Sequence, residues 1–325
     1  MESTCNHNED CFAVAFYGVS KEREALESYC QISSDWFSDL GHAPEILGVT
    51  GNGYAGRPQK FSRLYERVRK TRFSGVESVT VIAPLPNAKI PVDDYFLISG
   101  FDKGGRNAFL VVRSNLAQLS VDSMLPVIRR IISVIKPTYG IGYTRPHKYG
   151  PAMYALGICQ GGPLIAKGAL KEERTAISRW SGVGMKREVY RQGLLRDIYP
   201  WNFLTAPQLT RNVGGQSLEQ WIRSDSARGS LTVLDHGVTL WEVDQANIAG
   251  LRPCLDEAGV IFDWRKFVQM PTMPLSPEES LRMVLEGYER KGVNLEDIEV
   301  LRGQSGETMP DEEVRRIAKG PKRKK

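Results

Sequence analysis

The first 143 residues alternate short β-rich runs with helical stripes of apolar residues, and this order restricts the folds open to the chain. Cys11–Val19, Glu45–Thr50 and Ser78–Ala83 have the length and composition of strands. Glu22–Leu40 and Val121–Ile135 carry apolar residues at helical spacing. The helices do not separate every pair of strands, as a doubly wound parallel sheet would require.

Two segments carry the signal of a β-hairpin, which joins antiparallel strands. Strand-like runs flank Asp102-Lys103-Gly104-Gly105, and Ser230–Val243 alternates on both sides of Asp235-His236-Gly237. We therefore predict an α+β fold, with a mixed or mainly antiparallel sheet and helices on one face. A partly mobile helical extension is expected at the C-terminus.

Changes in composition divide the chain into three parts. Residues 1–143 form an α+β N-terminal half, and residues 144–270 a loop-rich C-terminal half packed on it. Residues 271–325 read as a linker, marked by three prolines, followed by a charged helical tail that ends in PKRKK.

The net charge is unevenly distributed. The chain has 43 Lys and Arg against 38 Asp and Glu, a formal charge of +5. Residues 310–325 hold seven basic and three acidic residues, so residues 1–309 carry only +1. The basic balance belongs mostly to the tail, which favours a protein partner over nucleic acid for the body of the chain.

The termini and cysteines indicate the compartment. Residues 1–5 lack the basic and apolar regions of a secretory signal, and the longest uncharged run, 149–166, is rich in glycine and proline. Five cysteines at irregular spacing suit reduced thiols. We expect a cytoplasmic protein that makes no use of a membrane.

A glycine-rich segment, Gly51–Gly56, matches the G-x-G-x-x-G pattern of dinucleotide-binding loops. The acidic residue expected at the end of the next strand is missing, because that strand ends Ile82-Ala83-Pro84-Leu85. A plain glycine turn is the favoured interpretation. An enzyme of unknown class near this loop stays open as an alternative.

The next segment, residues 57–72, is strongly basic, with Pro58 at a helix-starting position. Lys60, Arg63, Arg67 and Lys70 share one face of the predicted helix, opposite its apolar stripe. Such a face often contacts only solvent and has no binding role. It also suits an acidic protein partner or, together with the basic tail, a nucleic acid.

Candidates for chemistry are few. His147 beside Arg145 lies in a basic loop, His236 lies in the predicted hairpin turn, and Cys159 and Asp197 complete the set. Cys5, His7 and Cys11 have irregular spacing for a metal site. Because no catalytic motif anchors an enzyme, we lean towards a protein without catalytic activity, cofactor or metal.

The densest aromatic segment is 190–209, which contains Arg196, Asp197, Tyr199 and Trp201. Buried core is the default for such a cluster, and a protein-binding surface rich in Tyr, Trp and Arg is the alternative. Arg196-Asp197 beside Tyr199-Pro200 suggests a salt bridge that holds a fixed turn.

Four segments together resemble a largely uncharacterised family of bacterial proteins, similar in style to the immunity proteins of polymorphic toxin systems. They are Gly140–Pro146, Leu195–Leu204, the stretch from Gly215 to Trp221-Ile222, and Gly229–Val243. The resemblance covers roughly residues 10–265 and implies an α+β binding protein that neutralises a toxin. It assigns no functional residue. Our partner-binding candidates therefore come from the residues themselves, and they are Arg63, Arg67, Lys70, Arg145, His147, Arg196, Tyr199 and Trp201.

Overall fold

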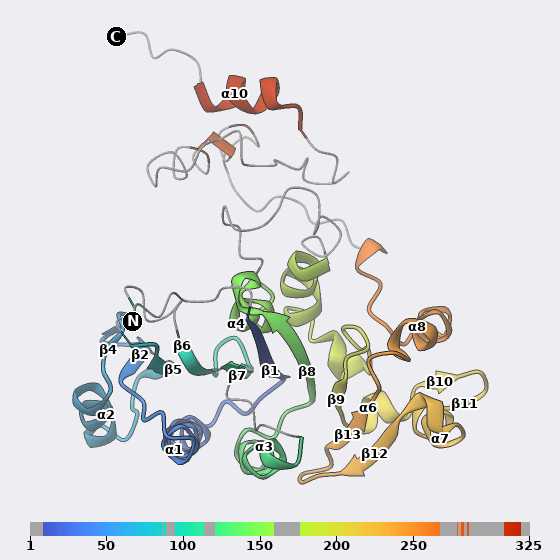
Figure 1. The fold of residues 1–325 in the computed structure, drawn as a ribbon, viewed down its shortest axis with the longest axis horizontal. Helices are drawn as coiled ribbons and strands as arrows, with labels where there is room; N and C mark the ends of the chain where they lie inside the picture. Colours follow the sequence, from blue (N-terminus) through green and yellow to red (C-terminus); the bar gives the residue numbers. More distant parts are fainter. Residues whose placement is uncertain are drawn as a thin grey trace.

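The computed structural model confirms the α+β class and an antiparallel sheet (Figure 1). It describes residues 9–86, 88, 95–113, 121–158, 176–266, 278, 281–282, 285 and 309–319. The main sheet follows the order β12-β13-β9-β8-β1-β7-β6-β5-β2-β3, and β4 pairs with β2 beside β3. In chain order its strands are β1 (Asp10–Tyr17), β2 (Ile46–Gly51), β3 (Tyr54–Ala55), β4 (Gln59–Lys60), β5 (Val76–Pro84), β6 (Tyr95–Asp102), β7 (Asn107–Arg113), β8 (Tyr139–Pro146), β9 (Trp201–Leu204), β12 (Ser230–Val233) and β13 (Thr239–Glu242). A separate pair consists of β10 (Asn212–Val213) and β11 (Gln216–Ser217).

Strand β1 lies at the centre of the sheet, and its alternation defines two cores. Val14 and Phe16 belong to the core on one face, whereas Ala15 and Tyr17 belong to the core on the other. This is the period of two expected for side chains along a strand. All seven residues of β7 are buried, so this part of the sheet must be covered on both faces.

The first face is covered by helices of the N-terminal half, as the apolar stripes predict. They are α1 (Arg23–Asp39), α2 (Phe61–Lys70) and α3 (Val121–Ile135), which lie below the sheet in Figure 1. The core beneath them is mainly aliphatic. We call it the aliphatic face.

The second face is covered by elements of the C-terminal half. The sequence predicted helices on one face, and these shorter elements add a layer on the other. Both faces of the central strands are apolar, so both need cover. The elements are η1 (His147–Tyr149), α4 (Pro151–Ala155), the π-helix η2 (Trp180–Met185), η3 (Val189–Gln192), α6 (Ala206–Leu209), α7 (Leu218–Arg223), η4 (Ser226–Arg228), α8 (Ile248–Glu257) and η5 (Trp264–Lys266). We call this side the aromatic face, because Tyr and Trp dominate its centre.

Both predicted hairpins are present. β6 pairs with β7, and β12 pairs with β13 through a turn in which His236 has a φ of 54°. The sheet continues from one half of the chain into the other, because β9 pairs with β8. The boundary predicted at residue 143 falls within β8.

The Gly140-Ile141-Gly142-Tyr143 motif lies in β8, and its second glycine has a packing role. A Cβ on Gly142 would lie 2.9 Å from Cβ of Trp201 on the neighbouring strand. Only hydrogen leaves room for that side chain, which explains a glycine within a strand.

Little of the predicted tail lies within the described residues. Helix α10 (Asp311–Lys319) buries Val314 and Ile317, and Arg316 Nη2 lies 3.2 Å from Glu278 Oε1. Residues 267–277 and 320–325 lie outside the described residues, so the predicted linker and the mobility of the tail stay predictions. None of the helices described combines the length and apolar character needed to cross a membrane.

Candidate functional site

The predicted site residues separate into three locations. Arg63, Arg67 and Lys70 lie on α2, which packs against β2 and β4 at one end of the sheet. Arg145, Arg196 and Tyr199 converge on Tyr154 at the aromatic face. His147 and Trp201 are buried elsewhere, and we describe them last.

Helix α2 begins at Phe61, later than the proline signal at Pro58 predicted. The reason is that Gln59 and Lys60 form β4 and pair with Leu47 and Ile46 of β2. The predicted amphipathic character is confirmed, since Leu64 and Val68 are buried. The helix is thus anchored to the aliphatic face.

The opposite side of α2 forms a basic surface, which we call the basic face. Every basic residue from 57 to 72 is exposed, and none forms an ion pair within the part of the chain that the structure describes. They are Arg57, Lys60, Arg63, Arg67, Arg69, Lys70 and Arg72. Three lie in the last turn of the helix, where a cation stabilises the negative end of the helix dipole by about 0.3–1 kcal/mol. The helix dipole accounts for those three, but it does not account for the other four, which are Arg57, Lys60, Arg63 and Arg72.

One aromatic ring belongs to this basic face. Cζ of Arg67 lies 5.2 Å from the ring centroid of Tyr54, within the range of a cation–π contact. The pattern of residues along the helix does not reveal this contact. Tyr54 precedes the helix in sequence, and the β2–β3 turn brings its ring to the helix surface. The contact holds Arg67 in a defined place on the surface.

The glycine segment Gly51–Gly56 forms that β2–β3 turn. Gly51 has a φ of 136°, and a Cβ there would collide with the carbonyl oxygen of Gly75. β2 and β5 run antiparallel, whereas the dinucleotide-binding fold places its glycine loop between a parallel strand and a helix. The geometry is that of a plain glycine turn.

Tyr154 is the residue that brings the second group of candidates together. Its ring lies between two guanidinium groups, with Cζ of Arg145 at 4.6 Å and Cζ of Arg196 at 4.1 Å from the centroid. Its hydroxyl is 2.8 Å from that of Tyr199. The sequence analysis missed Tyr154, although Pro151 gives the signal for the start of α4, which positions it.

Arg196 is a buried cation. Arg196 is only 8% exposed. Its Nη1 donates hydrogen bonds to the Tyr17 hydroxyl at 3.0 Å and to the Tyr154 carbonyl oxygen at 3.1 Å. Cζ also lies 5.6 Å from the Trp180 ring. Nη2 is closed to solvent and has no hydrogen-bond acceptor within the part of the chain that the structure describes. Arginine stays charged in such surroundings.

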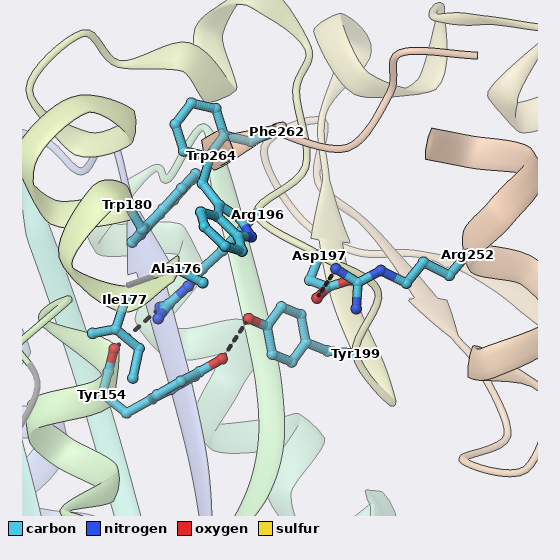
Figure 2. Close-up of a pocket in the computed structure, with 10 residues that line it drawn as sticks. All are labelled: Tyr154, Ala176, Ile177, Trp180, Arg196, Asp197, Tyr199, Arg252, Phe262 and Trp264. Atoms are coloured by element: carbon cyan, nitrogen blue, oxygen red, sulfur yellow. Dashed lines mark hydrogen bonds and ion pairs between the residues drawn. The ribbon is translucent and has the colours of Figure 1, made fainter. Parts of the chain in front are cut away.

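The neighbouring Asp197 does not pair with Arg196, so the predicted bridge is wrong. The two side chains point to different sides (Figure 2), and Asp197 Oδ2 lies 3.2 Å from Nη2 of Arg252 on α8. Burial raises the pKa of the Asp197 carboxyl, against the opposing effect of Arg252. The turn at Tyr199 is held instead by the buried Asn202, whose Oδ1 accepts from Tyr199 N and whose Nδ2 donates to Tyr199 O.

A cavity of about 290 Å³ opens between these groups (Figure 2). Its lining combines two arginines and one carboxylate with aromatic walls. The lining residues are Tyr154, Ala176, Ile177, Trp180, Arg196, Asp197, Tyr199, Arg252, Phe262 and Trp264. The cavity therefore combines aromatic walls with several converging polar and charged groups, which can fix the orientation of a bound ligand.

Trp201 and His147 are buried away from this cavity. Trp201 is 5% exposed and packs on Phe12 with ring centroids 4.9 Å apart, on the aliphatic face. The ring of His147, which is 7% exposed, lies 5.0 Å from that of Tyr95. A partner would reach either one only by displacing the surrounding packing. For Trp201 the structure favours the core over the interface interpretation.

No group of three or more His, Cys, Asp and Glu side chains within the described ranges is arranged to hold a metal ion. Cys11 is buried in β1, while Cys5, His7 and Cys159 lie outside the described residues. His236 is exposed in its hairpin turn. Among the described residues, the remaining chemical candidates therefore form no group that could hold a metal ion.

The sequence matches no protein-family model and no curated protein. Its structure is similar to that of the Pseudomonas aeruginosa T6SS protein PA0821, with a TM-score of 0.52 and 11% sequence identity. The similarity covers 78% of this chain and 77% of the other. At this identity the likeness shows a shared fold.

Proposed function

We propose that this chain is a non-enzymatic binding protein of the immunity type, which neutralises a protein toxin by docking on it through the basic face of α2. The observation that carries the proposal is the row of exposed cations without ion pairs, with Arg63, Arg67 and Lys70 among them. The fold shared with a T6SS protein is compatible with a role in a toxin system.

The basic face has the properties of a docking surface for an acidic protein. Its charges are not neutralised within the described chain, so their field extends into solvent and accelerates encounter with a partner of opposite charge. Burial of Leu64 and Val68 fixes the helix against the sheet, so little order is lost on binding. Arg67 and Tyr54 form a cation–π contact on this face. Arg and Tyr are among the residue types that contribute most of the binding energy at interfaces.

We propose that neutralisation is steric. A protein that covers the functional surface of a toxin with a rigid helix needs no catalytic residues of its own. A toxin whose active face is acidic, or is bordered by carboxylates, is the partner that fits this surface.

The test is a titration of the purified chain with the purified product of the reading frame next to its gene. Double reversal, Arg63→Glu with Arg67→Glu, should weaken binding by on the order of 100-fold or more, because each change replaces an attraction by a repulsion. Lys21→Glu with Lys186→Glu is the matched control. It alters the net charge equally at exposed positions outside α2 and should leave the affinity unchanged.

A nucleic acid is the competing occupant of the same face. Titration with labelled duplex DNA and with single-stranded RNA decides between the two. Binding to nucleic acid that weakens steeply with salt, and that the α2 reversals abolish, would support this alternative. Equal loss of protein binding in the control and α2 variants would contradict docking through α2.

A further inference from the structure

The buried charge of Arg196 has no counter-ion among the described residues. Asp197, its neighbour in sequence, is engaged by Arg252 at 3.2 Å. The surrounding hydroxyls do not replace a carboxylate, since burial raises the pKa of Tyr17, Tyr143 and Tyr199 and keeps them neutral. Among the described residues, only aromatic rings and uncharged oxygen atoms therefore stabilise the positive charge of Arg196.

This arrangement leaves part of the cost of burial uncompensated. Removing a charged group from water is costly, and an ion pair normally offsets that cost. The contacts with the Tyr154 and Trp180 rings recover only part of it. An unpaired Nη2 adds a donor without an acceptor. The cavity that Arg196 lines is the place from which an anion can reach it.

We propose that this cavity binds a small monocarboxylate with a planar apolar body. The carboxylate pairs with Arg196, and the flat body lies among Trp180, Phe262 and Trp264. Nη2, which has no acceptor among the described residues, would donate to the carboxylate after a small rotation of the guanidinium. Arg252, on the far side of Asp197, contributes a second positive charge at the same cavity.

Charge and size select this class of ligand. Two arginines and one carboxylate give the lining a net charge of +1, which one negative charge neutralises. A phosphate dianion would leave an excess negative charge between apolar walls. A volume of about 290 Å³ lies just below the range of about 300–1,000 Å³ typical of small-molecule sites, so the ligand is compact.

The cavity stands apart from the surface proposed to bind a toxin. It is enclosed by α4, η2 and α8 on the aromatic face, whereas α2 packs on the aliphatic face. A ligand in the cavity and a protein on α2 do not compete for residues. Each proposal can therefore fail without the other.

The experiment is calorimetric titration of the full chain with benzoate, phenylacetate and indole-3-acetate. Indole-3-acetamide is the neutral control, and inorganic phosphate is the control for a simple anion. We expect saturable binding of at least one acid. Where the acid is indole-3-acetate, the amide should bind about 10-fold or more weakly, because it loses the charge-assisted hydrogen bonds.

Variants of the lining locate the site without removing Arg196, whose loss would disturb folding. Ala176→Trp fills the cavity and should abolish binding. Arg252→Gln should weaken it by about 10-fold, as expected for the loss of one charged partner. Arg223→Gln, at an exposed position of α7 outside the cavity lining, should have no effect.

Three results would each overturn the proposal. The first is the absence of saturable binding for all three acids. The second is equal affinity for the amide or for phosphate. The third is unchanged binding in Ala176→Trp, provided that the variant keeps the thermal stability of the wild type.

Discussion

The two faces of the central sheet are packed by different means. The aliphatic face is closed by three helices, whose buried side chains include Leu64, Val68, Ile128 and Ile131. The aromatic face is closed by short helices and turns around Tyr17, Tyr139, Trp180 and Tyr190, whose rings are stacked or edge-on at 5.4–6.5 Å. One strand, β1, contributes to both cores.

This difference assigns the two faces different roles, since the aliphatic face mainly stabilises the fold and the aromatic face offers a place for ligand recognition. Aliphatic side chains bury area without directional partners, so regular helices can lie over them at many angles. Aromatic rings with hydroxyls need hydrogen-bond partners when buried, and they leave irregular spaces between them. The aliphatic face is covered by regular helices over aliphatic side chains, whereas the aromatic face holds a buried cation beside a cavity.

The largest expected effect comes from removing the ring at the centre of the aromatic face. Trp180→Ala should lower the free energy of unfolding by about 3–5 kcal/mol, because the side chain is 1% exposed and touches several rings. Ile131→Ala on α3 should lower it by about 2–5 kcal/mol. Urea denaturation measures both.

Ligand binding by the same two variants, Trp180→Ala and Ile131→Ala, compares the two faces a second time. Trp180→Ala removes a wall of the cavity and should abolish binding of the carboxylate probes, whereas Ile131→Ala should retain it. Loss of binding in both variants, under conditions in which both are folded, would show that the two faces do not differ in the way described.

A smaller effect, at alkaline pH, is concentrated on the aromatic face, because every buried tyrosine of the described residues except Tyr29 lies there. Burial raises the pKa of Tyr17, Tyr143 and Tyr199 above about 10, the value in an unfolded chain. Below pH 10 both states are protonated and the contribution to stability is complete. Above it the unfolded state releases protons that the folded state keeps, so each buried tyrosine lowers stability by about 1.4 kcal/mol per pH unit.

Tyr143→Phe tests this on the aromatic face, at the cost of one hydrogen bond to the Pro151 carbonyl. Urea denaturation between pH 8 and about pH 11 gives the free energy of unfolding as a function of pH. In the variant, its decrease with pH should be smaller by the contribution of one tyrosine. Tyr65, at the edge of the aliphatic face, has its pKa raised to about 12 by burial, so Tyr65→Phe should also reduce the slope over this range, and its contribution should end near pH 12. An unchanged slope in Tyr143→Phe would mean that Tyr143 ionises within the folded protein.

The sequence predicted the regular elements well and the irregular ones poorly. Periodicity identified α1, α3 and both hairpins, because each of them has a uniform apolar face. The same reasoning misplaced the start of α2, where Gln59 and Lys60 pair with β2. Pairing between distant segments overrides a local proline signal.

The candidate site was predicted only in part, for a similar reason. Arg145, Arg196 and Tyr199 were singled out from composition, but Tyr154, which joins them, lies in an apolar run without a charge to mark it. The partner of Asp197 is Arg252, 55 positions away along the chain. Such contacts depend on the arrangement of α4 and α8 over the sheet, which no local pattern contains.

Growth of bacteria that produce the product of the reading frame next to this chain's gene tests the central claim most directly. Co-production of the wild-type chain should restore growth, and the triple reversal Arg63→Glu, Arg67→Glu, Lys70→Glu should not. The control reversal Lys21→Glu, Lys186→Glu, Arg223→Glu changes the net charge equally and should protect as the wild type does. Full protection by the α2 variant, at wild-type protein levels, would contradict neutralisation through the basic face of α2.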